Sequence, residues 1–171
     1  LSEGIAQLLP LNTFIKLLVK RVVEAVRTKG GAGILYDEKG EQYVIVAARG
    51  DQSHLLNKSI PRDSALIREL ERSKYLMLEG AGDTVNEEMR GLNASLAIPS
   101  KFDKRIVGIL LLSGKKSEEA YTDEDIDLFV TFSQTAAVAI ENNRRYDAEK
   151  EKAEVAVEIA GKAQEAAENL A

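Results

Sequence analysis

The chain of 171 residues contains no cysteine, no tryptophan and a single histidine, His54. Without cysteine it cannot form a disulfide, a thiolate zinc site or a thioether link to a cofactor. With one histidine it cannot build a multi-histidine metal site or a catalytic centre that uses two imidazoles. No second ligand accompanies His54 in the sequence, so we interpret it as a surface histidine rather than a haem or metal ligand.

The sequence also lacks a run of about 18 apolar residues that would span a membrane, and its start lacks the layout of a signal peptide. Its net charge is -5, and no stripe of lysine and arginine is present to displace counterions from a nucleic acid. We therefore expect a cytoplasmic protein without membrane insertion or nucleic-acid binding. The length and the 44% hydrophobic content suit one domain with a substantial core.

Helical periodicity is clear near the start of the chain. Between residues 11 and 26 the apolar side chains follow the spacing of one helical face, and Pro10 suits the entry to that helix. We interpret residues 1–10 as the end of an upstream linker helix.

Two hairpins are predicted from apolar runs separated by short charged turns. The first turn, residues 37–40, ends at Gly40, which we expect to adopt a positive φ. The second turn is residues 101–104. The run at residues 106–112 is almost entirely apolar, which is typical of a central strand covered on both faces.

The middle of the chain, residues 51–93, is the least regular part. It predicts a short helix at about residues 63–73, a strand at residues 75–79, and then a loop with at most one helical turn. The glycines at residues 79–83 lack the lysine and hydroxyl of a phosphate loop, so we interpret them as part of a flexible lid. The order of elements predicts an antiparallel sheet flanked by helices, an α+β fold.

The last helix has a strong start signal. Thr122 and Asp125 have the spacing of a capping box, and Asp123 and Glu124 add negative charge at the positive end of the helix dipole. A metal site or an acid/base pair is the alternative interpretation of these carboxylates, and we favour helix capping.

This helix is predicted to continue to residue 171, because no proline interrupts it. At 1.5 Å per residue it would be roughly 75 Å long, so part of it must project from the domain. Ala156, Ile159, Ala163, Ala166 and Leu170 follow heptad spacing. Residues 147–171 are either a coiled-coil connector to a further module, which we favour, or a solvated tail.

The segment from Ser95 to Tyr146 resembles the second half of a GAF domain. It combines an Ile-Pro strand, a charged hairpin, a glycine-centred apolar strand, a lysine-bearing loop and a Thr-Asp-Glu-Asp helix start. Residues 11–146 as a whole are compatible with the family. The resemblance implies a PAS-related antiparallel sheet of about six strands, flanked by the first and last helices, with a small-molecule pocket on the other face.

By this resemblance the chain is a non-enzymatic regulatory domain of a bacterial signalling protein, of the kind that precedes histidine kinase or cyclic-di-GMP modules. It would sense a small metabolite, dimerise through its first and last helices and act on a C-terminal output module; the alternative is a ligand-free dimerisation spacer. The implied pocket residues are Met77, Glu79, Met89 and Ser95. The implied dimer residues are Phe14, Leu18, Val22, Val130, Ser133, Ala137 and Ile140.

Some family ligands are excluded by departures from the family pattern. A covalent bilin needs a cysteine, and we expect no haem either. The cyclic-nucleotide signature is incomplete, because its positions hold Gly114, Lys115, Tyr121, Asp125 and Ile126. We expect Lys115 and Asp125 to form a local ion pair, worth about 0 to 1 kcal/mol if exposed.

Overall fold

The computed structural model describes residues 10–170, so the predicted linker helix lies almost wholly outside the described residues. The elements are α2 (Leu11–Val26), β1 (Gly30–Asp37), β2 (Gln42–Gly50), the 3₁₀ helix η1 (Ser53–Leu55), β3 (Ser59–Pro61), α3 (Ala65–Glu71), β4 (Leu76–Met77), α4 (Asp83–Gly91), β5 (Leu96–Phe102), β6 (Arg105–Leu112) and α5 (Asp123–Asn169). The predicted α+β class is confirmed.

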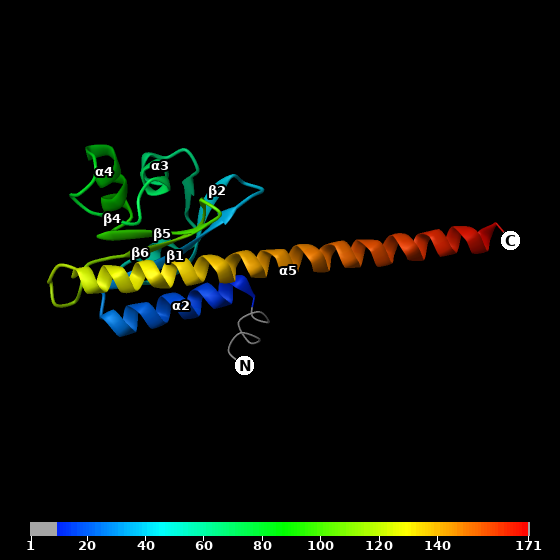
Figure 1. Cartoon of the computed structure of the whole chain (residues 1–171), viewed down its shortest axis with the longest axis horizontal. Coiled ribbons are helices and arrows are strands. Elements are labelled where there is room, and N and C mark those ends of the chain that lie inside the picture. Colours follow the sequence, from blue (N-terminus) through cyan, green and yellow to red (C-terminus); the bar gives the residue numbers. More distant parts are fainter. Residues whose placement is uncertain (1–9, 171) are drawn as a thin grey trace.

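The strands form one antiparallel sheet of six strands in the order β3-β2-β1-β6-β5-β4. Figure 1 shows α2 and α5 along one face of the sheet and α3 and α4 on the other. β6 has a central position and is buried from Ile106 to Leu112, as its apolar run predicted. The layers therefore form two separate cores, one on each face of the sheet.

The first core, here called the α3–α4 core, is built from strand residues together with Leu66, Ile67 and Leu70 of α3 and Met89 of α4. The second, the α2–α5 core, contains Val19 of α2 and Phe129, Ala137 and Ile140 of α5. Gly33 of β1 faces α2 in this second core. A Cβ at Gly33 would lie 2.4 Å from Cγ2 of Ile15, so only glycine allows the helix to approach so closely.

Both hairpins are confirmed, with one correction. The β5–β6 turn places Asp103 and Lys104 at φ 51° and 66°, as a tight two-residue hairpin turn requires. In the β1–β2 turn the positive φ belongs to Glu41, at 50°, and not to Gly40 as predicted. Gly40 instead leaves room for Asp37, whose Oδ2 would lie 2.6 Å from an added Cβ.

Before β5 we predicted a loop with at most one helical turn. This prediction was wrong, because the segment forms the nine-residue helix α4. Val85, Asn86 and Met89 form its buried face. Asn86 accepts a hydrogen bond from the N–H of Glu79 (3.0 Å) and donates one to the carbonyl of Ala81 (2.8 Å). These bonds fix the glycine-rich segment against α4. Asparagine is polar, so the periodicity of apolar residues in the sequence did not indicate that Asn86 is buried.

The helix α5 begins with the predicted capping box. Thr122 Oγ1 accepts a hydrogen bond from the N–H of Asp125 (3.1 Å), and Asp125 Oδ2 accepts one from the N–H of Thr122 (2.9 Å). The helix then continues for 47 residues, about 70 Å at 1.5 Å per residue. Every described residue from Arg145 onward is exposed, so the second half of α5 projects from the domain (Figure 1).

Candidate functional site

The four residues predicted to line a pocket do not surround a common cavity. Met89 is completely buried in the α3–α4 core, whereas Met77 packs against the α2–α5 core. Glu79 is exposed and forms an ion pair with Arg90 at 2.6 Å. Ser95 is half-buried, and its N–H donates to the carbonyl of Leu112 (2.8 Å). Ligand contact by these residues stays a prediction.

Packed side chains occupy the face of the sheet where the resemblance implied a pocket. The largest of them have less than 2% of their surface exposed: Ile34, Ile45, Leu55, Leu66, Ile67, Leu70, Met89 and Leu111. Protein interiors of this kind are close-packed. A metabolite bound among these residues would have to displace them.

A more open region lies where β1 and β6 stop pairing. Their ladder runs from Gly31 and Leu112 to Leu35 and Gly108, although β1 continues to Asp37 and β6 starts at Arg105. We call the space between the ends of the β1–β2 and β5–β6 hairpins the fork. Buried carbonyl groups need hydrogen-bond donors, so the carbonyls that the ladder leaves unpaired here require donors from side chains or from water.

Two side chains supply these donors. The guanidinium of Arg144, in α5, donates to the carbonyl of Tyr36. The hydroxyl of Tyr43 donates to the carbonyl of Ile106 at 3.1 Å. Burial is the main cause that raises the pKa of Tyr43 to about 12, so this phenol keeps its proton at neutral pH. Side chains from β2 and α5 thus close the ladder where backbone pairing ends.

The fork contains a hollow with a volume of about 320 Å³. It is lined by Tyr36, Glu38, Tyr43, Arg62, Glu71, Lys104, Arg105, Ile106, Val107 and Arg144. The rings of Tyr36 and Tyr43 lie 4.9 Å apart between centroids, at 51° to one another. Apolar, aromatic and charged groups therefore meet in one cavity, which the sequence did not indicate.

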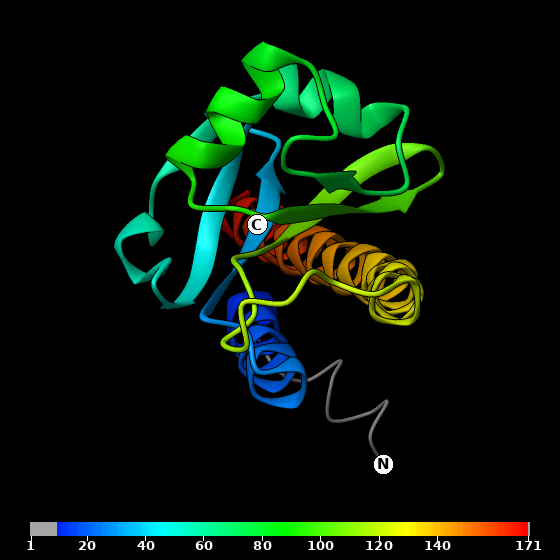
Figure 2. The same ribbon diagram turned by 90° about the vertical axis from the view of Figure 1, so that its left-hand side faces the viewer.

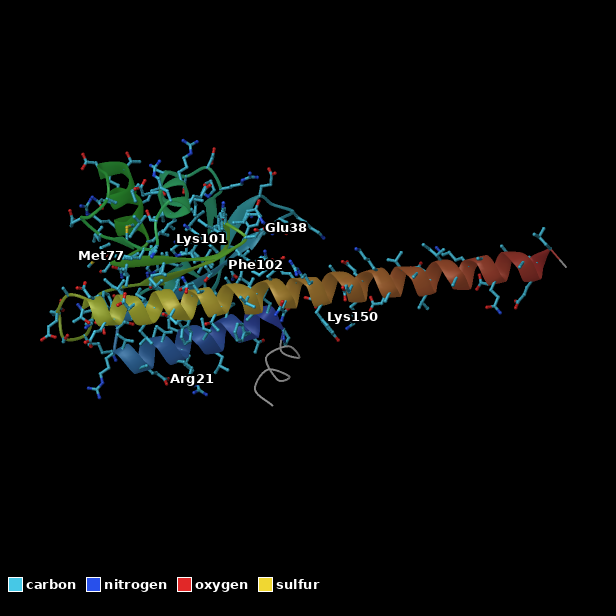
Figure 3. The ribbon with its side chains drawn as sticks, in the orientation of Figure 1. Arg21, Glu38, Met77, Lys101, Phe102 and Lys150 are labelled. Atoms are coloured by element: carbon cyan, nitrogen blue, oxygen red, sulfur yellow. The ribbon has the colours of Figure 1, made fainter. Side chains whose placement is uncertain are left out.

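The fork lies beside the point where α5 leaves the domain. Arg145 of α5 lies over the ring of Phe102, 5.3 Å from its centroid, and pairs with Glu141 at 3.4 Å. Figure 3 places Glu38 and Phe102 at this end of the sheet, with Met77 at the opposite end and Lys150 on the projecting part of α5. The final turns of α5 within the domain thus contact strands of both hairpins.

The residues predicted to form a dimer interface divide into two groups. Val22, Ser133, Ala137 and Ile140 are buried within the domain, so they are not accessible to a second copy in this conformation. Phe14, Leu18 and Val130 are half-buried. Figure 2 shows α2 and α5 side by side beneath the sheet, and their outer faces expose Leu17 (43%), Leu128 (57%) and Val138 (49%), which the prediction missed.

A narrow groove separates α2 from α5, with Leu18 and Phe132 among its lining residues and Gly33 and Gly108 at its floor. Its volume is about 20 Å³, which is room for about one water molecule. This groove is too small for a metabolite.

The other residues considered in the sequence are an ion pair and an exposed histidine. Lys115 and Asp125 form the predicted ion pair at 2.6 Å. His54 is exposed in η1. Within residues 10–170 no three histidine, aspartate or glutamate side chains gather to hold a metal ion. None of the helices in this part of the chain is both long and apolar enough to cross a membrane.

Comparison with known proteins places this architecture in a family. The sequence profile of the GAF domain matches residues 12–142. None of the curated protein sequences compared with the chain matches it.

Three solved structures illustrate the similarity of fold. The GAF domain of a phosphoenolpyruvate-protein phosphotransferase from Coxiella burnetii is 21% identical, with a TM-score of 0.66 over 85% of this chain and 91% of that one. A methyl-accepting chemotaxis protein (14% identity, TM-score 0.68) is matched over 84% and 97%. The phycoerythrobilin-bound GAF domain of a cyanobacterial phytochrome (14%, 0.63) is matched over 81% and 89%. Because the profile covers most of its length, this chain belongs to the GAF domain family.

Proposed function

We propose that this domain is a dimeric sensor that passes the state of its core along α5 to an output module on its C-terminal side. The continuity of α5 is the observation that carries the proposal. Phe129 and Ile140 of α5 are buried in the α2–α5 core, while Val157 and Ile159 of the same helix are exposed beyond the domain. A change at the sheet therefore acts on the projecting helix without an intervening loop.

For such a relay to work, the two states of the domain must differ in affinity for the input. The contacts of α5 with the sheet are the element that such an input has to shift. Similar folds in a chemotaxis protein and a phosphotransferase are consistent with a regulatory use of this architecture.

We propose a second copy of this chain as the partner of the α2–α5 surface. Leu17 of α2 and Leu128 and Val138 of α5 are large apolar side chains that the single chain leaves exposed. A partner that covers them would remove this apolar surface from water. The same helix also carries the alanine-rich heptad positions from Ala156 to Leu170, all exposed. Since α5 runs through both regions, we propose that one symmetric partner contacts both.

Sedimentation equilibrium on the whole chain tests the dimer. We expect the wild type to be a dimer and the variant with Leu17→Glu and Leu128→Glu to be a monomer with unchanged circular dichroism. The matched control carries Leu56→Glu and Tyr75→Glu, two similarly exposed apolar residues outside α2 and α5, and should remain dimeric. A wild type that stays monomeric at high concentration contradicts the proposal.

A second candidate, a ligand-free dimerisation spacer, is favoured by one observation: the α3–α4 core is filled by buried side chains. Thermal denaturation with a metabolite library distinguishes the two functions. A ligand at 100 times its Kd stabilises the folded state by about 2.7 kcal/mol, which is a readily measured shift in Tm. A library-wide absence of such shifts, together with an intact dimer, supports the spacer.

A further inference from the structure

We propose that the hollow at the fork is a binding site for a small organic anion, a carboxylate or phosphate attached to a flat apolar body. Binding there is a property of the domain itself. Its effect on α5, through Arg144, rests on the proposed relay function.

The charge of the lining is the first argument. Arg62, Lys104, Arg105 and Arg144 face the hollow together with two carboxylates, Glu38 and Glu71. The lining therefore has two more cations than carboxylates, in a chain whose net charge is -5. Two further carboxylates, Glu41 and Glu141, lie outside the lining, 3.7 Å from Arg62 and 4.0 Å from Arg105. A cleft with one predominant sign of charge attracts ligands of the opposite sign.

The second argument is that the cations of the lining lie farther from carboxylates than other cations of the domain do. For comparison, three ion pairs elsewhere have N–O distances of 2.6 Å: Lys115–Asp125, Arg90–Glu79 and Arg72–Glu69.

At the fork, the closest carboxylate oxygens are 3.7 Å from Arg62 (Glu41) and 4.0 Å from Arg105 (Glu141). Arg144 donates to a neutral carbonyl, and Lys104 has no ion-pair partner within residues 10–170. At Arg62, Lys104 and Arg105, charge-assisted hydrogen bonds to a bound anion would therefore not have to replace a close ion pair.

The remaining lining defines the rest of the ligand. Tyr36 and Tyr43 present aromatic surface, and Ile106 and Val107 present aliphatic surface. A ligand with an apolar body would cover these groups, whereas a bare inorganic ion would leave them in water. Glu38 and Glu71 oppose a ligand with several negative charges, so a single anionic group fits best.

Arg144 connects this site to α5. Its guanidinium donates to the carbonyl of Tyr36, and it also lines the hollow. An anion at the fork would compete with that carbonyl for the guanidinium. Occupancy would then change the contact that joins β1 to the last turn of α5 inside the domain.

Nuclear magnetic resonance titration of the whole chain at constant ionic strength tests the site, with benzoate and phenyl phosphate as anions and benzyl alcohol as the neutral analogue. We expect either anion to shift the amide resonances around Tyr36, Arg105 and Arg144, with a Kd at least about tenfold lower than that of benzyl alcohol. Equal binding of the alcohol, or no binding of either anion, overturns the proposal.

The variant with Lys104→Asn and Arg105→Gln removes two lining cations, and asparagine tolerates the positive φ at position 104. We expect it to weaken anion binding at least about tenfold. The control with Lys58→Gln and Lys74→Gln removes two exposed charges outside the lining and should bind like the wild type. Equal weakening in both variants would mean that only net charge matters and would contradict a site.

The same titration on the Leu17→Glu, Leu128→Glu variant separates this proposal from the proposed function. Anion binding should persist there whether or not the wild type is a dimer, because neither residue lines the hollow. Loss of binding in a folded form of that variant would contradict a site contained within one chain.

Discussion

The guanidinium of Arg144 in α5 donates a hydrogen bond to the main-chain carbonyl of Tyr36 in β1, 108 residues earlier in the chain. The bond lies where the β1–β6 ladder has ended and where α5 is about to leave the domain. One side chain therefore satisfies a strand carbonyl and fixes the base of the projecting helix.

Replacement Arg144→Ala should lower the free energy of unfolding by about 1 to 3 kcal/mol, because the part-buried carbonyl of Tyr36 loses its donor. Urea denaturation measures the loss, and hydrogen exchange should show faster opening of residues 141–146. The control Lys150→Ala, on the exposed part of the same helix, should stay within about 0.5 kcal/mol of the wild type. Equal stability of the two variants would contradict the anchoring role.

Replacement Tyr43→Phe should cost about 1 to 3 kcal/mol, because the carbonyl of Ile106 loses a buried donor. The folded state raises the pKa of Tyr43 to about 12, mainly through burial, from 10.0. A raised pKa gives stability that is complete below pH 10 and is lost as the pH rises toward 12. Urea denaturation between pH 8 and pH 11 should therefore show a smaller fall in stability for the variant than for the wild type.

Replacement Asp125→Asn should remove part of the acid sensitivity of the domain. The hydrogen bond from Lys115, followed by that from the N–H of Thr122, holds the pKa of Asp125 below its usual value of 3.8. A lowered pKa gives stability that is present above that value and is lost as the pH falls through the folded-state pKa.

The Asp125→Asn variant should accordingly be less stable at pH 7, by about 1 kcal/mol for a weakened cap, and should lose less stability than the wild type below pH 4. Asp127→Asn is the matched control, because Asp127 lies exposed on the same turn of α5. The prediction fails if both variants show the same acid profile.

Replacement Met89→Ala should cost about 2 to 5 kcal/mol, because Met89 is completely buried and its loss leaves a cavity. Met77→Ala removes the same atoms from a half-buried position and should cost less. Thermal denaturation of both variants makes the comparison. A cost for Met89→Ala below about 1 kcal/mol would indicate an adaptable pocket on this face instead of a packed core.

Local patterns in the sequence were sufficient for much of the fold. The helix at residues 11–26 follows from its apolar spacing, and the capping box at Thr122 and Asp125 is contained within four residues. The turn at Asp103 and Lys104 is equally local. Such features depend on neighbours in the chain, which is why periodicity and turn chemistry predict them.

The errors arose where distant segments decide the structure. α4 was missed because its buried face includes Asn86, a polar residue whose partners are backbone groups of the preceding loop. The fork was not predictable, because it needs the end of β1, the start of β6 and Arg144 of α5 to meet. Leu17 and Leu128 were overlooked since their exposure depends on how α2 and α5 rest on the sheet.

Because α5 is one uninterrupted helix, a small tilt at its base moves its far end by a larger distance. Roughly 25 residues project beyond the domain, about 37 Å at 1.5 Å per residue. A tilt of about 3° at the last buried turn would displace the far end by about 2 Å over that length. A tilt that shifts the side chains around Ile140 only slightly therefore moves the C-terminal end of α5 by about 2 Å.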